Sequence, residues 1–361
     1  MSKLHELEQN GQSIWYDFIR RDMLTGPGLA DLVAAGIRGV TSNPSIFENA
    51  IAGSTLYDDQ IAELGDMSPV AVFEELAVAD IRAAADVLAG VFTSSQGGDG
   101  YVSLDVSPTL AHDTAGTVAD AYRLWAKVDR PNLMIKVPAT PAGVAAIEQL
   151  TADGMNINAT LMFSLADYEA VAQAYVAGSK RCLDPASLAS VASFFVSRVD
   201  SYTDAALDDI GTPEAVALKG KAAVANAKLA YRRYQEIFEG PTFADLAARD
   251  VRPQRALWAS TSTKNPSYRD VMYVEELVGP NTVNTAPPAT IDAFEDHGAV
   301  TPGTLTGGVD EARQVFADLA RVGVDFDVIT DTLQADGVRA FADAFASLLE
   351  AIADKQAAIA G

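Results

Sequence analysis

Residues 133–138 read LMIKVP, a short apolar run that contains one lysine, and no other stretch says more about the fold. Side chains alternate along a strand, so Lys136 shares a face with Met134 and points away from the aliphatic side chains of the other face. Prolines at 138 and 141 end the run, and apolar residues at 144, 147 and 150 follow at helical spacing. The pattern predicts a strand, a short loop and a helix, with Lys136 at the carboxyl end of the strand.

A lysine in this position is a candidate nucleophile. A neutral amine attacks a carbonyl to form a Schiff base, but a free lysine has a pKa of about 10.4 and is protonated at neutral pH. Lowering that value by about three pH units requires about 4 kcal/mol, which desolvation in an apolar barrel supplies. The alternative interpretation of Lys136 is a solvated lysine at a strand end.

Other short runs of the chain resemble strands and alternate with segments of helical length. The strand-like runs cover 13–18, 39–43, 101–107, 157–163, 188–195, 255–260 and 281–286, and the helical segments include 69–89, 113–126, 166–177 and 213–238. Such alternation predicts parallel strands, and with LMIKVP the count favours a closed (β/α)₈ TIM barrel over an open doubly wound sheet. The turn G-x-G-x-x-G of dinucleotide-binding open sheets does not occur in the sequence.

The length of the chain alone does not settle the number of domains. With 361 residues, of which 49% are hydrophobic, the chain can form two small domains or one large barrel. No linker, internal repeat or low-complexity segment divides the sequence, so we predict one barrel domain over residues 1–361. Residues 309–361 are predicted to be a helical C-terminal extension packed on the outside of the barrel.

The net charge of −23 argues against nucleic acid and anionic membranes as partners, because their phosphates are repelled. A phosphorylated small molecule is not excluded, since salt screens charges beyond about 10 Å and a few cations in a cleft can hold it. No apolar stretch approaches the about 20 residues that span a bilayer, and residues 1–12 lack the apolar core of a signal peptide. Cys182 is the only cysteine, so no intramolecular disulfide forms. These features predict a soluble cytoplasmic protein.

Active sites of TIM barrels form at the carboxyl ends of the strands, so polar residues there are the candidates. Asp17 lies among aromatic residues, Asp105 lies on the polar face of residues 101–107, and Asn158 and Thr160 alternate with apolar residues. An amine, carboxylates, an amide and a hydroxyl at one mouth suit carbon–carbon bond chemistry on a polyhydroxy carbonyl compound. For Asp17, an ion pair with the arginine at 20 or 21 is the structural alternative.

Several blocks of the sequence are similar to those of a known family. They are VTSNPSIF (40–47), NLMIKVPAT (132–140), NINATLMFS (156–164), SFFVSRVD (193–200) and VNTAPP (283–288). In this order they resemble the transaldolases, Schiff-base (β/α)₈ aldolases of the pentose phosphate pathway, and the layout is closest to the long, actinobacterial type. The resemblance covers about residues 11–294.

The resemblance implies a role for each matching residue. Lys136 is the Schiff-base nucleophile, Asp17 the acid/base at the C4 hydroxyl of the sugar, and Thr160 a residue that holds the catalytic water. The residues implied in substrate binding are Asn43, Asn158 and Ser193 for the donor sugar, and Arg198, Lys264 and the neighbouring Ser262 for the phosphate.

Two positions depart from the pattern of the family. Asp105 stands where a glutamate is usual, so the carboxylate that acts through the water is about 1.5 Å shorter in reach, and a shifted water has to compensate. Lys264 stands where many members have an arginine, and it supplies charge without the bidentate fork.

The resemblance thus implies an enzyme that transfers dihydroxyacetone from sedoheptulose 7-phosphate or fructose 6-phosphate to glyceraldehyde 3-phosphate or erythrose 4-phosphate. We expect no cofactor and no metal, because no group of His, Cys and carboxylates has the spacing of metal ligands. A monomer or a homodimer is expected. Two alternatives stay open, namely a fructose 6-phosphate aldolase that releases free dihydroxyacetone, and a sugar-phosphate binding barrel that lost turnover through the change to Asp105.

Overall fold

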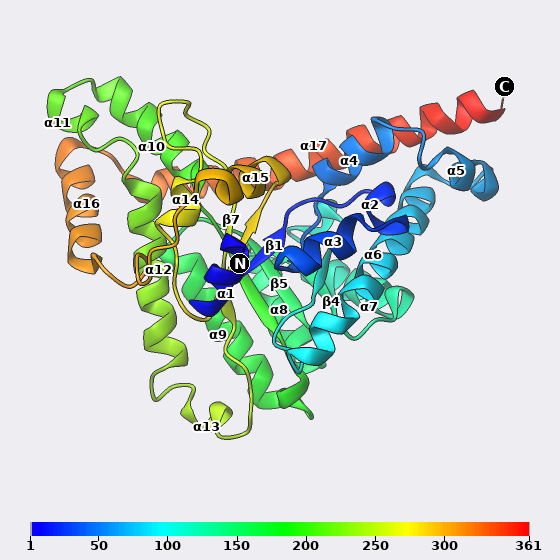
Figure 1. Cartoon of the computed structure of the whole chain (residues 1–361), viewed down its shortest axis with the longest axis horizontal. Coiled ribbons are helices and arrows are strands. Elements are labelled where there is room, and N and C mark those ends of the chain that lie inside the picture. Colours follow the sequence, from blue (N-terminus) through cyan, green and yellow to red (C-terminus); the bar gives the residue numbers. More distant parts are fainter. Residues whose placement is uncertain (1, 361) are drawn as a thin grey trace.

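The strands of the computed structural model close into a barrel in chain order, and each strand is parallel to its neighbours (Figure 1). The structure describes residues 2–360, so Met1 and Gly361, the ends of the predicted domain, lie outside it. The predicted (β/α)₈ barrel is confirmed. Its strands are β1 (Gln12–Tyr16), β2 (Ile37–Val40), β3 (Val102–Asp105), β4 (Leu133–Pro138), β5 (Ile157–Met162), β6 (Ser190–Phe195), β7 (Arg255–Ala259) and β8 (Thr282–Ala286).

Helices surround the barrel and fill the connections between its strands (Figure 1). The longer connecting helices are α6 (Pro69–Ser94), α7 (Thr114–Val128), α8 (Pro141–Ala152), α9 (Leu165–Arg181), α10 (Ser197–Ile210), α12 (Ala222–Phe238) and α15 (Pro288–His297). The shorter ones are α1 (Lys3–Gln9), α2 (Arg21–Thr25), α3 (Gly28–Ala35), α4 (Pro44–Ala52), α5 (Asp58–Leu64), η1 (Pro108–Leu110), η2 (Pro185–Ser187), α11 (Pro213–Val216), α13 (Ala244–Ala247) and α14 (Met272–Glu275).

The helix predicted over 213–238 is in fact two helices, α11 and α12, so this prediction is wrong. Gly220 lies between them with a φ of +71°, a conformation that favours glycine. A Cβ atom at Gly220 would lie 2.8 Å from the ring of Tyr268, which packs there. The break thus contains a glycine in the left-handed conformation, and Tyr268 from a distant loop packs against it.

Strand β4 has the predicted bounds and the predicted two faces. Its aliphatic side chains at 133, 135 and 137 are fully buried, and Lys136, on the other face, is 5% exposed. The strand ends where a proline leads into α8, whose first turn is capped by the Thr140 side chain accepting from the N–H of Gly143. This short connection holds Lys136 near the carboxyl-terminal rim of the barrel.

Two helices follow β8 and α15, and they lie in different places. Helix α16 (Val309–Val322) packs on the outer helix α12, whereas α17 (Phe326–Ala360) contacts α4, α5, α6, α10 and β5. The Gln334 side chain donates to the carbonyl oxygens of Ala139 (3.2 Å) and Leu161 (3.4 Å), just beyond Lys136 on β4 and at the end of β5. Helix α17 is thereby anchored to the rim at which Lys136 lies.

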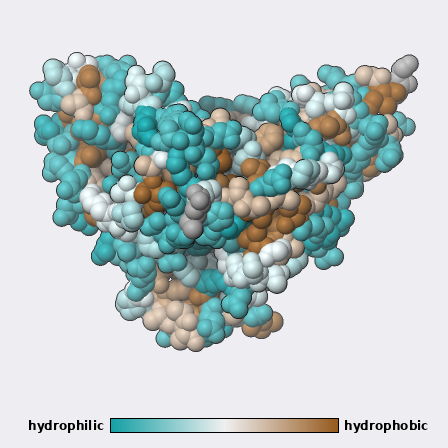
Figure 2. All heavy atoms as spheres, in the orientation of Figure 1, coloured by the Kyte–Doolittle hydropathy of each residue, from teal (hydrophilic) through white to brown (hydrophobic). Residues whose placement is uncertain are grey.

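The face of the molecule in Figure 2 is largely hydrophilic, with apolar residues gathered in smaller patches. This surface agrees with the excess of acidic residues in the composition. Among residues 2–360, no helix is both long enough and apolar enough to cross a membrane.

Candidate active site

A cavity of about 300 Å³ lies at the carboxyl ends of the strands and receives residues from most of them. All predicted site residues line it except Asp105 and Asn158, and these two contact residues that do. The predicted residues that line the cavity are Asp17, Asn43, Lys136, Thr160, Ser193, Arg198, Ser262 and Lys264. The structure therefore brings the candidates together at one mouth.

The amine of Lys136 lies between polar groups in a part of the barrel with little solvent exposure. Its Nζ donates to the carbonyl oxygen of Ser42 (2.7 Å) and lies 3.5 Å from Oδ1 of Asp105. Asp105, Lys136 and Asn158 are consecutive partners in the register of β3, β4 and β5, so they lie at one level of the barrel. The ring centre of Phe341, from α17, lies 5.6 Å from the amine on a further side.

The two carboxylate oxygens of Asp105 have different surroundings. Its Oδ1 faces Lys136, whereas the buried Oδ2 has no hydrogen-bond partner in the protein. Burial raises the pKa of Asp105 to about 6, against the opposing charge of Lys136, and repulsion from Asp17 adds to the rise. A carboxyl group with such a pKa gains and loses a proton close to neutral pH, as a general acid/base requires.

The hydroxyl of Thr160 is a further buried group without a hydrogen-bond partner in the protein. Thr160 pairs in register with Pro138, two residues beyond Lys136, and its Oγ1 forms no hydrogen bond within the protein. Buried polar atoms of this kind are commonly satisfied by water. Asp105 and Thr160 thus both have hydrogen-bonding capacity that the protein leaves unused.

Asp17 is not part of an ion pair with its neighbours in sequence. Arg20 pairs with Asp22, and Arg21 pairs with the buried Asp80. Neither arginine therefore forms the ion pair with Asp17 that was the alternative interpretation. Instead, Oδ1 of Asp17 accepts from the hydroxyl of Thr41 (2.6 Å), while its backbone N–H donates to the end of β8. One carboxylate oxygen is held in place and the carboxylate faces the cavity.

The side-chain amides of Asn158 and Asn43 are oriented by hydrogen bonds to neighbouring groups of the protein. Asn158 donates to Ser103 (2.9 Å) and accepts from the hydroxyl of Ser193 (2.7 Å), so it fixes the direction of that hydroxyl. The side-chain oxygen of Asn43 caps α4 by accepting from the N–H of Ile46 (3.0 Å). The amide NH₂ of Asn43 is then the group left for a ligand.

Two cations lie together at another part of the cavity. Arg198 is the second residue of α10, and Lys264 follows β7 in a loop, where its amine donates to the hydroxyl of Ser262 (2.7 Å). Partial desolvation, followed by the charge of Arg198, lowers the pKa of Lys264. Within residues 2–360, neither cation forms an ion pair with a carboxylate. Two unneutralised cations beside a helix amino terminus are suited to a phosphate.

Sequence analysis missed Phe341, Thr41 and the carbonyl group of Ser42. Phe341 belongs to α17, which the sequence describes only as a helical extension, and no local signal places one of its aromatic residues over a lysine far earlier in the chain. Thr41 lies directly beyond β2, and the rule that strand ends carry the site could have found it. Among the described residues, no three His, Cys, Asp or Glu side chains form a group able to hold a metal ion.

Comparison with known proteins supports the resemblance seen in the sequence blocks. A family model described as Transaldolase/Fructose-6-phosphate aldolase matches residues 14–352. Curated proteins named Transaldolase from Frankia alni and Thiobacillus denitrificans are 52% and 50% identical to the chain, over 98% of it and 97% and 100% of their own lengths. Transaldolase 1 of Streptomyces coelicolor is 48% identical over 97% of the chain and 93% of that protein. From the barrel through most of α17, the chain belongs to the transaldolase family.

Proposed function

We propose that the protein is a transaldolase that moves a dihydroxyacetone unit between sugar phosphates through a Schiff base on Lys136. The observation that carries this proposal is the buried amine of Lys136, 3.5 Å from the carboxylate of Asp105, in a cavity that is also lined by two cations without an ion-pair partner. The amine suits a carbonyl group and the cations suit a phosphate, so the substrate class is a phosphorylated ketose.

In the first step, the neutral amine of Lys136 adds to the C2 carbonyl of the ketose and gives a carbinolamine. Loss of its hydroxyl as water then leaves the iminium ion. Asp105 supplies and takes up the protons through a water molecule that it holds together with Thr160. The distance of 3.5 Å between Nζ and Oδ1 is longer than that of a charge-assisted hydrogen bond, so the carboxylate lies beside the amine without binding it tightly.

In the second step, Asp17 takes the proton of the C4 hydroxyl, and the bond between C3 and C4 breaks. The electron pair moves into the iminium ion, which becomes an enamine, and the aldose phosphate leaves. An acceptor aldose phosphate then reacts with the enamine by the reverse sequence, in which Asp17 returns its proton to the new hydroxyl. Hydrolysis through the water at Asp105 releases the new ketose phosphate and restores the amine.

The remaining residues bind the substrates. Arg198, Lys264 and Ser262 hold the phosphate of the donor or the acceptor, while Asn43 and Ser193 contact sugar hydroxyls, with Asn158 orienting Ser193. Fructose 6-phosphate or sedoheptulose 7-phosphate is the donor in this proposal, and erythrose 4-phosphate or glyceraldehyde 3-phosphate the acceptor. We place the reaction in the cytoplasm, as a step of the pentose phosphate pathway, with the protein a monomer or a homodimer.

Borohydride reduction in the presence of fructose 6-phosphate tests the covalent step. We expect a reduced three-carbon adduct on the peptide that contains Lys136 and none on the peptide that contains Lys264, which serves as an internal control. Protein without an adduct on Lys136 would contradict the proposal and favour a binding barrel.

Dependence on an acceptor separates transfer from simple cleavage, because the family description includes fructose 6-phosphate aldolases. We expect fructose 6-phosphate to be consumed steadily only when an aldose phosphate acceptor is present. Release of free dihydroxyacetone at the same rate with and without the acceptor would show a lyase instead.

A further inference from the structure

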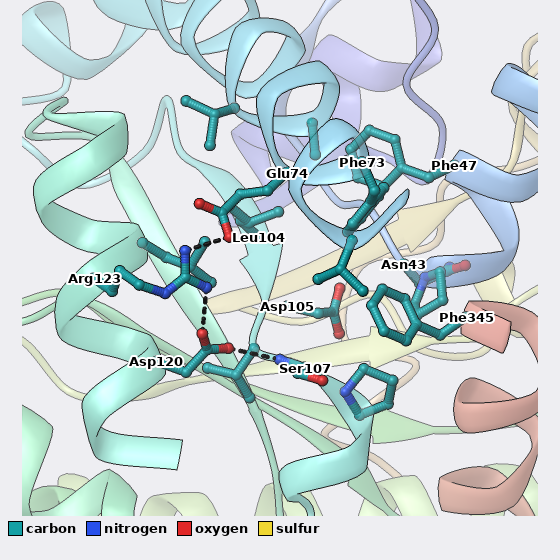
Figure 3. A pocket seen from close by; sticks show the side chains of 17 residues that line it. Asn43, Phe47, Phe73, Glu74, Leu104, Asp105, Ser107, Asp120, Arg123 and Phe345 are labelled. Atoms are coloured by element: carbon teal, nitrogen blue, oxygen red, sulfur yellow. Dashed lines mark hydrogen bonds and ion pairs between the residues drawn. The ribbon is translucent and has the colours of Figure 1, made fainter. Parts of the chain in front are cut away.

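A second cavity, of about 150 Å³, is lined by Asp105 (Figure 3). Its lining differs from that of the cavity that holds Lys136. Its walls come from α4, α6, α7, β3 and α17, and Asn43 is the one residue that lines both cavities. We call it the Asp105 side cavity. A molecule inside it reaches the carboxylate without occupying the place of the sugar.

One wall of the Asp105 side cavity is aromatic. Phe73 of α6 packs edge to face against Phe47 of α4, with ring centres 5.6 Å apart, and against Phe345 of α17, at 5.5 Å. Valine, leucine and proline side chains complete much of the remaining lining. An aromatic ligand continues such edge-to-face contacts, and an apolar cavity of about 150 Å³ is known to accept benzene.

The charged residues of the Asp105 side cavity are already satisfied by one another, with one exception. Arg123 forms ion pairs with Glu74 and Asp120, and Asp120 also accepts from the N–H of Ser107 (2.9 Å), as Figure 3 shows. Asp105 differs, because its buried Oδ2 has no hydrogen-bond partner in the protein.

The residues that line the Asp105 side cavity favour one chemical class of ligand. Asp105 lines the cavity and the protein leaves acceptor capacity of its carboxylate unused, so a ligand with a hydrogen-bond donor is favoured. A cation is disfavoured because Lys136 already faces Oδ1 of the same carboxylate, and an anion is repelled by the carboxylates of the lining.

We propose that the Asp105 side cavity binds a small neutral aromatic molecule with one hydrogen-bond donor, of the size of phenol, and that its binding slows the reaction by engaging Asp105. The binding does not depend on the proposed function, whereas the slowing rests on it. The ligand occupies a different cavity from the sugar, so it lowers kcat and leaves the KM for fructose 6-phosphate unchanged.

Phenol, toluene and benzoate test the chemistry of the site on the full chain, with binding followed by calorimetry or ligand-observed NMR. Phenol and toluene have nearly the same shape and differ by the hydroxyl. We expect phenol to bind about tenfold more tightly than toluene, because only phenol donates to the carboxylate, and benzoate to bind more weakly than either. Equal affinity for phenol and toluene, or tightest binding of benzoate, overturns the proposal.

Variants of α6 locate the binding. Ala77→Leu fills the inner wall, and Val70→Trp covers the rim, where Val70 is 48% exposed and a larger side chain leaves the core intact. Val216→Trp in α11 is the matched control, because Val216 is 49% exposed and does not line the cavity. We expect the Kd for phenol to rise at least tenfold in Val70→Trp and to stay at the wild-type value in Val216→Trp.

Kinetics without and with phenol complete the test. Val70→Trp is expected to keep the wild-type kcat without phenol and to lose inhibition by phenol. An unchanged Kd for phenol in both α6 variants, or inhibition that is competitive with fructose 6-phosphate, overturns the proposal. Phenol binding in a protein that forms no adduct on Lys136 would instead leave the site intact and refute the proposed function.

Discussion

Asp99 and Asp105 lie at opposite ends of the third strand and differ in how fully the protein satisfies them. Asp99, before β3, accepts from the indole N–H of Trp15 (2.7 Å) with one oxygen and from the hydroxyl of Ser13 with the other, and Arg255 lies 3.4 Å away. Asp105, the last residue of β3, has Lys136 on one oxygen and no hydrogen bond on the other.

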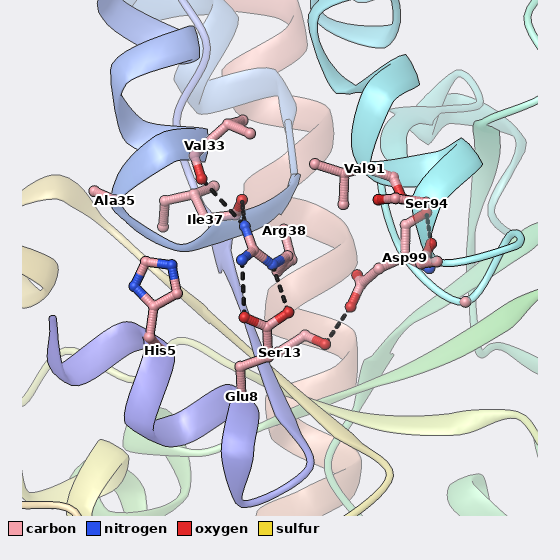
Figure 4. Close-up of polar contacts among 12 residues, drawn as sticks. His5, Glu8, Ser13, Val33, Ala35, Ile37, Arg38, Val91, Ser94 and Asp99 are labelled. Carbon is pink, nitrogen blue, oxygen red and sulfur yellow. Dashed lines mark hydrogen bonds and ion pairs between the residues drawn. The ribbon is translucent and has the colours of Figure 1, made fainter. Parts of the chain in front are cut away.

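The two aspartates thus show a difference between the carboxylates at the two ends of the barrel. At the amino-terminal end, the carboxylates are matched to donors, as in the pair of Glu8 with Arg38 and the contact of Asp99 with Ser13 (Figure 4). At the carboxyl-terminal end, hydrogen-bonding capacity is left over for ligands. The satisfied carboxylates are expected to stabilise the fold, and the groups with unused capacity are expected to bind ligands and react.

The largest effect is expected from removing the amine that defines the reactive end. Lys136→Ala should lower kcat at least about 10,000-fold, because no other group can form the Schiff base. The matched control is Lys228→Ala, since Lys228 is also mostly buried but lies on α12 near Glu276. Steady-state turnover of fructose 6-phosphate with an acceptor measures both variants, and substantial turnover by Lys136→Ala would assign the nucleophile elsewhere.

The next effect concerns the partly satisfied aspartate. Asp105→Asn should lower kcat about 100- to 1,000-fold, because the amide can position a water molecule but cannot take up its proton. Asp105→Glu should be tolerated or faster, since it keeps the acid and restores the longer reach usual in the family. An Asp105→Asn variant with wild-type kcat would remove Asp105 from the mechanism.

Replacing the aspartate at the amino-terminal end of the barrel by asparagine should lower the stability of the protein and leave kcat unchanged. Asp99→Asn places an NH₂ group against the donors of Ser13 and Arg255, so the free energy of unfolding should fall by about 1–3 kcal/mol. The kcat per folded molecule should stay at the wild-type value. Denaturant titration and active-site titration measure the two quantities, and a selective loss of kcat would abolish the contrast between the two ends.

A smaller effect is expected from pH. Burial raises the pKa of Asp105 from an ordinary value near 3.8 to about 6, so the group is ionised above pH 6 and protonated below it. Because the carboxylate acts as the base, kcat should fall as pH drops through about 6, by about tenfold per pH unit. This fall of kcat at low pH should be absent from the residual activity of Asp105→Asn. A wild-type profile that stays flat down to pH 4.5 would argue that Asp105 is not the base.

The sequence predicted the barrel and most of the site because both depend on local patterns. Two-residue alternation and prolines define β4, and parallel strands bring their carboxyl ends together, so Asp17, Lys136 and Thr160 meet at one mouth once the fold is known. The resemblance to the transaldolases, confirmed by the family comparison, added roles that alternation alone does not supply.

What escaped sequence analysis depends on contacts between distant segments. Residues 213–238 have a helical pattern, and the break between α11 and α12 contains Gly220, which packs closely against the ring of Tyr268. Phe341 reaches Lys136 because α17 packs across α4, α6 and α10 and is also bonded through Gln334 to the rim of the barrel. The aromatic cluster of Phe47, Phe73 and Phe345 joins three helices that are far apart in the chain.

The position of α17 also imposes an order in time. A ribosome makes the chain from its amino terminus, so all the strands of the barrel are synthesised before Phe341 and Phe345. Phe341, whose ring centre lies 5.6 Å from the amine of Lys136, is made after both members of the Asp105–Lys136 pair. A chain truncated before α17 would lack this ring and the contacts of Gln334 at the rim.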